Sequence, residues 1–107
     1  MESHQQIDAR SLVLARAIAS RIDADTEHRA IDKARVRCAR WRQAAQCADL
    51  DLWAELLWRP WSEIRSVLLD PSERGARLRQ SNPFCGVLSP RERWTLYRSF
   101  RHDPSAA

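Results

Sequence analysis

Apolar residues recur at three- and four-residue spacing along most of this chain, and that spacing places them on one face of a helix. No stretch alternates apolar and polar residues at period two, as a half-buried strand would. The chain has 107 residues, of which 44% are hydrophobic and only 2 are glycine, and this length is typical of one domain. The sequence therefore predicts an all-α fold, a compact bundle of five or six short helices in a single domain over residues 1–107.

Capping side chains and prolines mark where the predicted helices begin. The predicted starts are, in chain order, Asp8, Thr26, Asp49 or Asp51, Pro60, Asp70 and Ser89. The last two are the strongest, because each combines a cap, a proline at the first helical position and a glutamate at the third. The first helix is expected to end near residues 23–25, and the second, predicted to be the longest, near Gln46. Residues 1–7 and 102–107 are expected to fray.

The stretch 81–88 lies between the last two predicted helices and contains a proline and a glycine. Its apolar residues Phe84, Val87 and Leu88 are too hydrophobic to be left in water. We therefore expect an ordered loop that contributes side chains to the core.

Basic residues are concentrated in two parts of the chain. The formal net charge is +4, and every one of the 18 basic residues except Lys33 is arginine. On the second predicted helix, four bases fall together on a side away from the apolar stripe. We call this set the basic face; it comprises Arg29, Lys33, Arg37 and Arg40. Such a face can follow a nucleic-acid backbone, dock an acidic protein or simply be solvated.

Tryptophans cluster near the middle of the chain. Trp53, Trp58 and Trp61 account for three of the five tryptophans and lie within nine residues. A domain of this size must either bury such an apolar cluster in its core or offer it to a partner. Arg59 and Arg65 lie beside the cluster, and tryptophan and arginine are enriched among the residues that contribute most to interfaces. These five residues are the candidates for a partner interface.

The residue pattern contains no constellation for catalysis or cofactor binding. The three histidines are scattered, with no second histidine or cysteine at metal-ligand spacing, and 2 glycines cannot make a conventional phosphate loop. Cys85 precedes a glycine, but a nucleophilic cysteine needs a base beside it, and the sequence names none. We therefore expect no catalytic residue, no metal site, no cofactor and no small-molecule substrate.

Cysteine usage and hydropathy indicate the compartment. The chain has three cysteines, an odd number with no C-x-x-C pair, which argues against a closed disulfide framework. The polar residues at the start lack the features of a secretory signal, and no apolar run approaches the roughly 20 residues that cross a bilayer. We expect a soluble cytoplasmic protein with reduced thiols and no membrane contact.

The C-terminal third also carries a resemblance. Residues 70–74 (DPSER), 77–81 (RLRQS), 83–84 (PF) and 88–94 (LSPRERW) resemble small all-helical bacterial proteins that are sometimes encoded beside toxin genes, and residues 14–19 and 34–41 are similar in character. The resemblance implies a bacterial, antitoxin-like accessory protein that works by binding a partner. The resemblance supplies no catalytic or binding residues that could be assigned to this sequence.

The sequence thus predicts a non-enzymatic protein that binds a protein partner or a second copy of itself. The partner would meet Trp53, Trp58, Trp61, Arg59 and Arg65. The alternative is a nucleic-acid-binding regulator that uses the basic face of the second helix.

Overall fold

Six helices account for the regular structure of residues 4–102, the part of the chain that this computed structural model describes. They are α1 (His4–Asp23), α2 (Arg29–Ala44), α3 (Ala48–Leu56), α4 (Trp61–Leu68), α5 (Glu73–Arg79) and α6 (Pro90–His102). No strand occurs between residues 4 and 102, so the predicted all-α fold with five or six helices is confirmed. None of the described helices is both long enough and apolar enough to cross a membrane.

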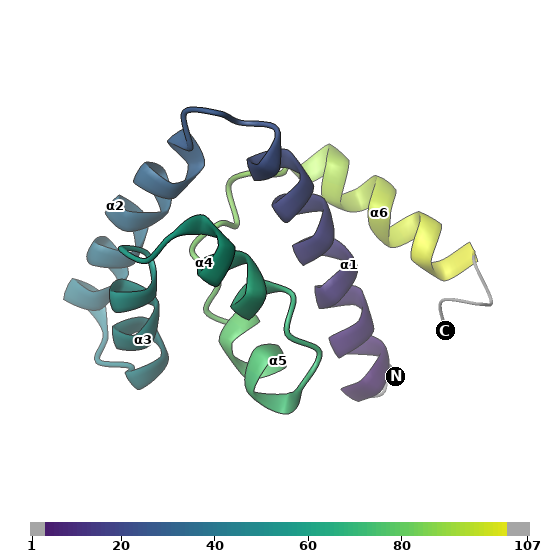
Figure 1. Cartoon of the computed structure of the whole chain (residues 1–107). Helices are drawn as coiled ribbons and strands as arrows, with labels where there is room; N and C mark the ends of the chain where they lie inside the picture. Colours follow the sequence, from purple (N-terminus) through teal and green to yellow (C-terminus); the bar gives the residue numbers. More distant parts are fainter. Residues whose placement is uncertain (1–3, 103–107) are drawn as a thin grey trace.

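The helices are arranged around α1, which packs against α4, α5 and α6 (Figure 1). On one side of α1 lies α6, and on the other lie α4 and α5, which pack against each other. Helices α2 and α3 form a second packed pair beyond α4 (Figure 1). The fraying expected at residues 1–3 and 103–107 lies outside the described residues, whereas residues 4–7 and 102, expected to fray, are helical.

The core is built from the apolar stripes of all these helices except α6, together with the segment that follows α5. Its buried members are Ala15, Ile18, Ala19 and Ile22 of α1, Ile31, Ala34 and Cys38 of α2, Trp53 and Leu57, Ile64 and Leu68 of α4, Leu78, Phe84 and Leu88. The apolar stripes that three- and four-residue spacing predicts over residues 12–22 of α1 and over residues 31–45, in α2 and just beyond its end, are therefore buried over most of their length. Only residues at the ends of these stripes are not buried: Leu12 and Trp41 are half-buried, and Ala45 is exposed.

The segment 81–88 is a loop that contributes to the core, as predicted. Phe84 is completely buried and meets Trp53 and Trp61 edge-on, with ring centroids 6.2 and 6.3 Å apart. The Asn82 side-chain oxygen accepts the Phe84 backbone N–H at 2.8 Å, which is the local turn that Asn favours. This loop therefore fills the space between α3 and α4 without a helix of its own.

Arg79, at the end of α5, is buried although arginine rarely is. Its Nε donates to the Ser11 hydroxyl at 2.9 Å, and its Nη1 donates to the Leu68 and Asp70 carbonyl oxygens at 3.3 and 2.5 Å. The side chain thus ties α1, α4 and the α4–α5 connection together. Gly75 lets α5 pack closely against the α4–α5 connection, because a Cβ there would lie 2.0 Å from the Asp70 carbonyl oxygen.

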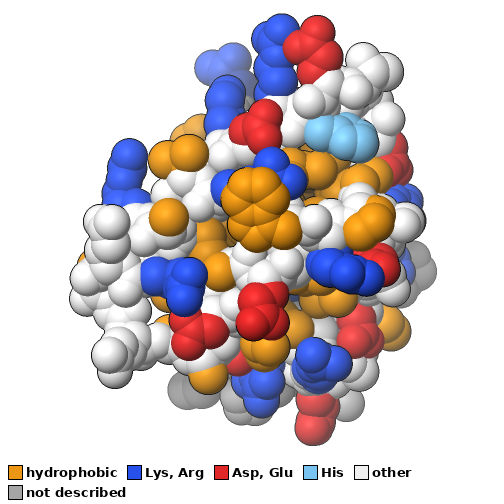
Figure 2. Space-filling view, turned by 60° about the vertical axis from the view of Figure 1, so that its left-hand side comes forward, with side chains coloured by type: hydrophobic (Ala, Val, Ile, Leu, Met, Phe, Trp, Pro, Cys, Tyr) orange, Lys and Arg blue, Asp and Glu red, His pale blue; other side chains and the backbone are white. Residues whose placement is uncertain are grey.

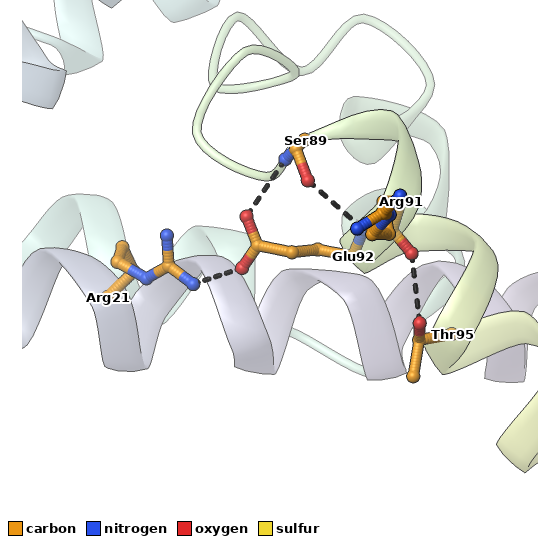
Figure 3. A network of polar contacts seen from close by, with 5 residues as sticks. All are labelled: Arg21, Ser89, Arg91, Glu92 and Thr95. Carbon is orange, nitrogen blue, oxygen red and sulfur yellow. Dashed lines mark hydrogen bonds and ion pairs between the residues drawn. The ribbon is translucent and has the colours of Figure 1, made fainter.

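One of the two strong helix starts has the predicted geometry. Ser89 caps α6: its hydroxyl accepts the Glu92 N–H, and Glu92 Oε1 accepts the Ser89 N–H, both at 3.1 Å (Figure 3). The reciprocal pair is a capping box. The second oxygen of Glu92 binds Arg21, which joins the start of α6 to α1 (Figure 3).

The other predicted starts are displaced. The cap of α5 is Ser72 and not Asp70, since the Ser72 hydroxyl accepts the Gly75 N–H at 3.3 Å. Pro60 occupies the cap position of α4, one residue before the predicted place. Asp49 and Asp51 lie in the first turn of α3 and not at its cap. A carboxylate there still interacts favourably with the positive end of the helix dipole. Asp8 lies inside α1.

The start of α2 was predicted at Thr26 and lies at Arg29 instead. His28 precedes the helix with φ of 50°, in the left-handed region, and has no side-chain cap bond. Asp25 supplies the missing acceptor, because its carboxylate accepts the N–H groups of Arg29 and Glu27 at 2.8 and 3.2 Å. The later start and the end at Ala44 leave α2 with 16 residues against 20 in α1, so α1 is the longer helix.

Replacing Trp53 tests its place in the core. Trp53→Ala is expected to lower the free energy of unfolding by about 3–5 kcal/mol, because it empties a large buried site and removes the indole N–H donor from the Leu78 carbonyl. Trp94 is 58% exposed, and Trp94→Ala is expected to cost less than about 1 kcal/mol. Urea unfolding followed by circular dichroism measures both, and equal losses would contradict this packing.

Candidate interaction surfaces

The five predicted interface residues do not form one patch, because the structure separates the tryptophans. Trp53 has only 1% of its surface exposed, and its Nε1 donates to the Leu78 carbonyl at 2.8 Å. A partner therefore has no surface of Trp53 to contact, and its inclusion among the interface residues was wrong. The reason is positional, since Trp53 lies on the side of α3 that faces Phe84.

Trp61 and Arg65 lie together where α4 meets α1. Trp61 is half-buried against Phe84, and its Nε1 donates to Asp23 Oδ1 at 2.7 Å. Arg65 Nε donates to the other carboxylate oxygen of Asp23 at 3.1 Å. The hydrogen bond from Trp61, with that from Arg65, holds the pKa of Asp23 below its usual range. Both residues thus fasten two helices, and they leave a smaller surface for a partner.

Trp58 has the opposite environment, since 74% of its surface is exposed. The guanidinium of Arg35 lies over its ring, 4.1 Å from the centroid, in a cation–π contact. Arg35 is itself fixed, because its Nε donates to the Leu57 carbonyl at 3.0 Å and its Nη1 pairs with Asp32 at 2.9 Å. The ring is therefore exposed on a prearranged base. Sequence reasoning missed Arg35, which lies 23 residues before Trp58 with no pattern connecting them.

Ion pairs surround this tryptophan. Arg59, the next residue, binds Glu63 with Nε at 2.7 Å and Nη2 at 3.0 Å. That hydrogen bond lowers the pKa of Glu63. We define the Trp58 surface as Trp58 with the pairs Arg35–Asp32 and Arg59–Glu63. On the side of the molecule where α2 and α3 lie, hydrophobic side chains gather in the middle with acidic and basic side chains around them (Figure 2).

The basic face runs along a side of α2 that borders the loop 81–88 and the end of α1. Its members Arg29, Lys33 and Arg40 are exposed, whereas Arg37 is half-buried. Two shallow hollows of about 390 and 350 Å³ border it, and Lys33 and Arg37 line both. Val36, 61% exposed, lies in the second hollow among these bases.

The four bases differ in how far their charges are already engaged. Arg29 pairs with Glu27, its Nε at 2.6 Å from the carboxylate. Arg37 Nη1 donates to the Pro83 carbonyl at 2.8 Å and the side chain lies across Gly86, where an added Cβ would be 2.6 Å from Nη2. Lys33 and Arg40 have no acidic partner within the described residues. The face thus keeps its uncompensated charge at Lys33, Arg37 and Arg40.

The cysteines are spread over three environments. Cys38 is buried, and that burial raises the pKa of its thiol, while Cys47 is half-buried and Cys85 exposed. In the described part of the chain, no three His, Cys, Asp or Glu side chains gather in a way that could hold a metal ion.

No family model, no curated protein and no solved structure matches the chain.

The Asp23 carboxylate predicts a pH dependence of stability. Because its folded-state pKa is depressed, it stabilises the fold above the unfolded pKa, and this contribution is lost as the pH falls through the folded value. Asp23→Asn is therefore expected to be less stable than the wild type at neutral pH, and the difference should shrink below about pH 4. Urea unfolding at a series of pH values measures it. A difference that stayed constant down to about pH 2 would contradict the assignment.

Proposed function

We propose that this protein acts by binding a protein partner at the Trp58 surface, as an accessory or regulatory protein and not as an enzyme. The observation that carries the proposal is the exposed Trp58 ring stacked on Arg35. Tryptophan and arginine dominate the binding energy of many interfaces. Covering a large aromatic ring that is exposed to water lowers the free energy of the complex. The resemblance to antitoxin-like proteins fits this role, with a toxin as one class of partner.

The rigidity of the stack favours recognition. Arg35 is held by a backbone carbonyl and by Asp32, so Trp58 sits on an ordered support before any partner arrives. Less conformational entropy is then lost on binding. A contact made by a prearranged aromatic side chain is typical of an interface anchor.

The charges around Trp58 favour a protein over a polyanion. Arg35 is paired with Asp32, and Arg59 is paired with Glu63, so this surface carries balanced charge. A nucleic acid gains affinity from bases that are free to neutralise phosphates. A protein surface with an apolar pocket and a mixed polar rim complements this arrangement better.

Replacing Trp58 tests the proposal. Tagged wild-type protein, Trp58→Ala and Trp94→Ala are used to capture partners from the organism that encodes the chain, with nuclease present. Trp94 is the control because it is also an exposed tryptophan, on α6. Trp58→Ala is expected to weaken capture of the wild-type partner by about tenfold or more, as the loss of an interface anchor does.

Two results would contradict this function. Capture that is equally strong with Trp58→Ala would remove Trp58 from the interface. Equal weakening by Trp94→Ala would show that any exposed tryptophan has the same effect. Circular dichroism confirms that both variants are folded, and light scattering distinguishes a second copy of the chain from another protein.

Nucleic acid is the second candidate partner, and the basic face favours it. Lys33, Arg37 and Arg40 are close together on one side of α2 and have no acidic partner in the described residues. A helix with several uncompensated bases can follow a phosphate backbone.

The salt dependence of binding tests this second role. Three or four phosphate contacts on a DNA duplex predict a slope of about −3 when log K is plotted against log salt concentration. Lys33→Glu with Arg40→Glu is expected to weaken binding and flatten the slope, while Arg91→Glu on the exposed side of α6 should change neither as much. Fluorescence anisotropy of a labelled duplex measures it. An equal effect of Arg91→Glu would contradict a role for the basic face.

A further inference from the structure

A cavity on a different part of the molecule has the features of a small-ligand site. It has a volume of about 230 Å³ and lies among α1, the end of α2, the loop 81–88 and α6, with the buried Arg79 in its wall. We call it the Arg79 cavity. Sites for drug-sized ligands have roughly 300–1,000 Å³, so this cavity fits a smaller molecule.

The charge of the Arg79 cavity is one-sided. Arg79 and Arg93 line it, and no acidic residue does. Arg79 is only 6% exposed, yet no carboxylate lies within ion-pair distance of it in the described part of the chain. Burial lowers its pKa, while Asp8 and Asp70 act on it only through longer-range attraction. A buried cation without a contacting anion is costly, and a bound anion would relieve that cost.

Arg79 also keeps a donor available. Its Nε and Nη1 are used by Ser11 and by two backbone carbonyls. Its Nη2 has no hydrogen-bond partner among the described residues, and it is not sealed from solvent, since no fully buried side-chain nitrogen or oxygen lacks a partner there. The three existing bonds hold the guanidinium still, so Nη2 is prearranged as a donor.

Apart from the two arginines, the lining is partly polar, from Ser11, Gln80 and Cys85, and partly apolar and aromatic. Leu14, Ile18 and Leu88 line the cavity, and the half-buried ring of Trp41 borders it. Asn82 adds a polar group. Because its side-chain oxygen already accepts the Phe84 N–H, its amide nitrogen is the group that can still donate a hydrogen bond to a ligand. Apolar walls combined with polar groups that can orient a ligand are typical of a small-molecule site.

We propose that the Arg79 cavity binds a small organic carboxylate. Its carboxylate would take hydrogen bonds from Arg79 Nη2 and from Arg93, whose side chain has no partner in the described residues. Its apolar part would lie against Leu88 and the Trp41 ring. Arginine suits carboxylates because its planar donors match the two oxygens. This site is independent of the Trp58 surface, so either assignment can fail without the other.

Benzoate is the probe that tests the site, with benzamide as its uncharged analogue. In spectra of the ¹⁵N-labelled protein, benzoate at millimolar concentration is expected to shift the Trp41 indole and Asn82 side-chain amide signals saturably. Benzamide is expected to bind at least about tenfold more weakly, because it lacks the charge that strengthens a hydrogen bond to arginine. Inorganic phosphate is titrated in parallel and should shift these signals less, since it cannot occupy the apolar walls.

Variants of α6 separate a built site from general attraction of anions. Arg93→Gln is expected to weaken benzoate binding about tenfold, whereas Arg91→Gln, which removes the same charge from an exposed position outside the cavity, should leave it unchanged. Neither change touches the buried bonds of Arg79, so both variants should fold. Equal effects of the two variants, no saturable shift with benzoate, or equal binding of benzoate and phosphate would each overturn the proposal.

Discussion

The buried ring of Phe84 is the contact on which the arrangement of this small bundle depends. Helices α3 and α4 are 9 and 8 residues long, so neither is stable without tertiary packing. Phe84 meets an aromatic ring from the start of α4 and one from α3, and both contacts are edge-on. An irregular segment therefore supplies the central residue of the core, and the loop 81–88 is ordered because its apolar side chains are needed there.

This core decides how the three neighbouring tryptophans are used. Trp53 packs on Phe84 inside the molecule, and Trp61 packs on it from the edge and binds Asp23. Trp58 comes after the end of α3, where the chain turns towards α4, and points away from the core. Within nine residues, one tryptophan thus packs the core, one fastens two helices and the third is left exposed, where a partner contact is proposed.

The fold was predictable because its signals are local. Helical spacing and the absence of period-two alternation were enough for the all-α class, and the capping box at Ser89 was read directly from four residues. Where several acceptors compete for one helix start, as Asp70 and Ser72 do, local preference cannot choose between them. The start of α2 depended on the left-handed backbone of His28, a conformation that histidine adopts more often than most residues but still too rarely to be predicted from sequence.

The candidate sites were less predictable because they depend on contacts between distant residues. The stack of Trp58 on Arg35 and the burial of Arg79 join residues 23 and 68 positions from their partners. The basic face could be predicted, since it follows from the period of a single helix. Which tryptophan faces solvent could not, because a short helix of 9 residues next to a turn allows several orientations until the core is complete.

We propose that Trp58 contacts a protein partner. The most direct measurement replaces Trp58 with a photoreactive amino acid in cells that make the protein, with the same replacement at Trp94 as the comparison. Irradiation is expected to join one protein, or a second copy of the chain, to position 58 and not to position 94. Cross-links that are the same at both positions, or a partner that co-purifies without any cross-link at position 58, would contradict it.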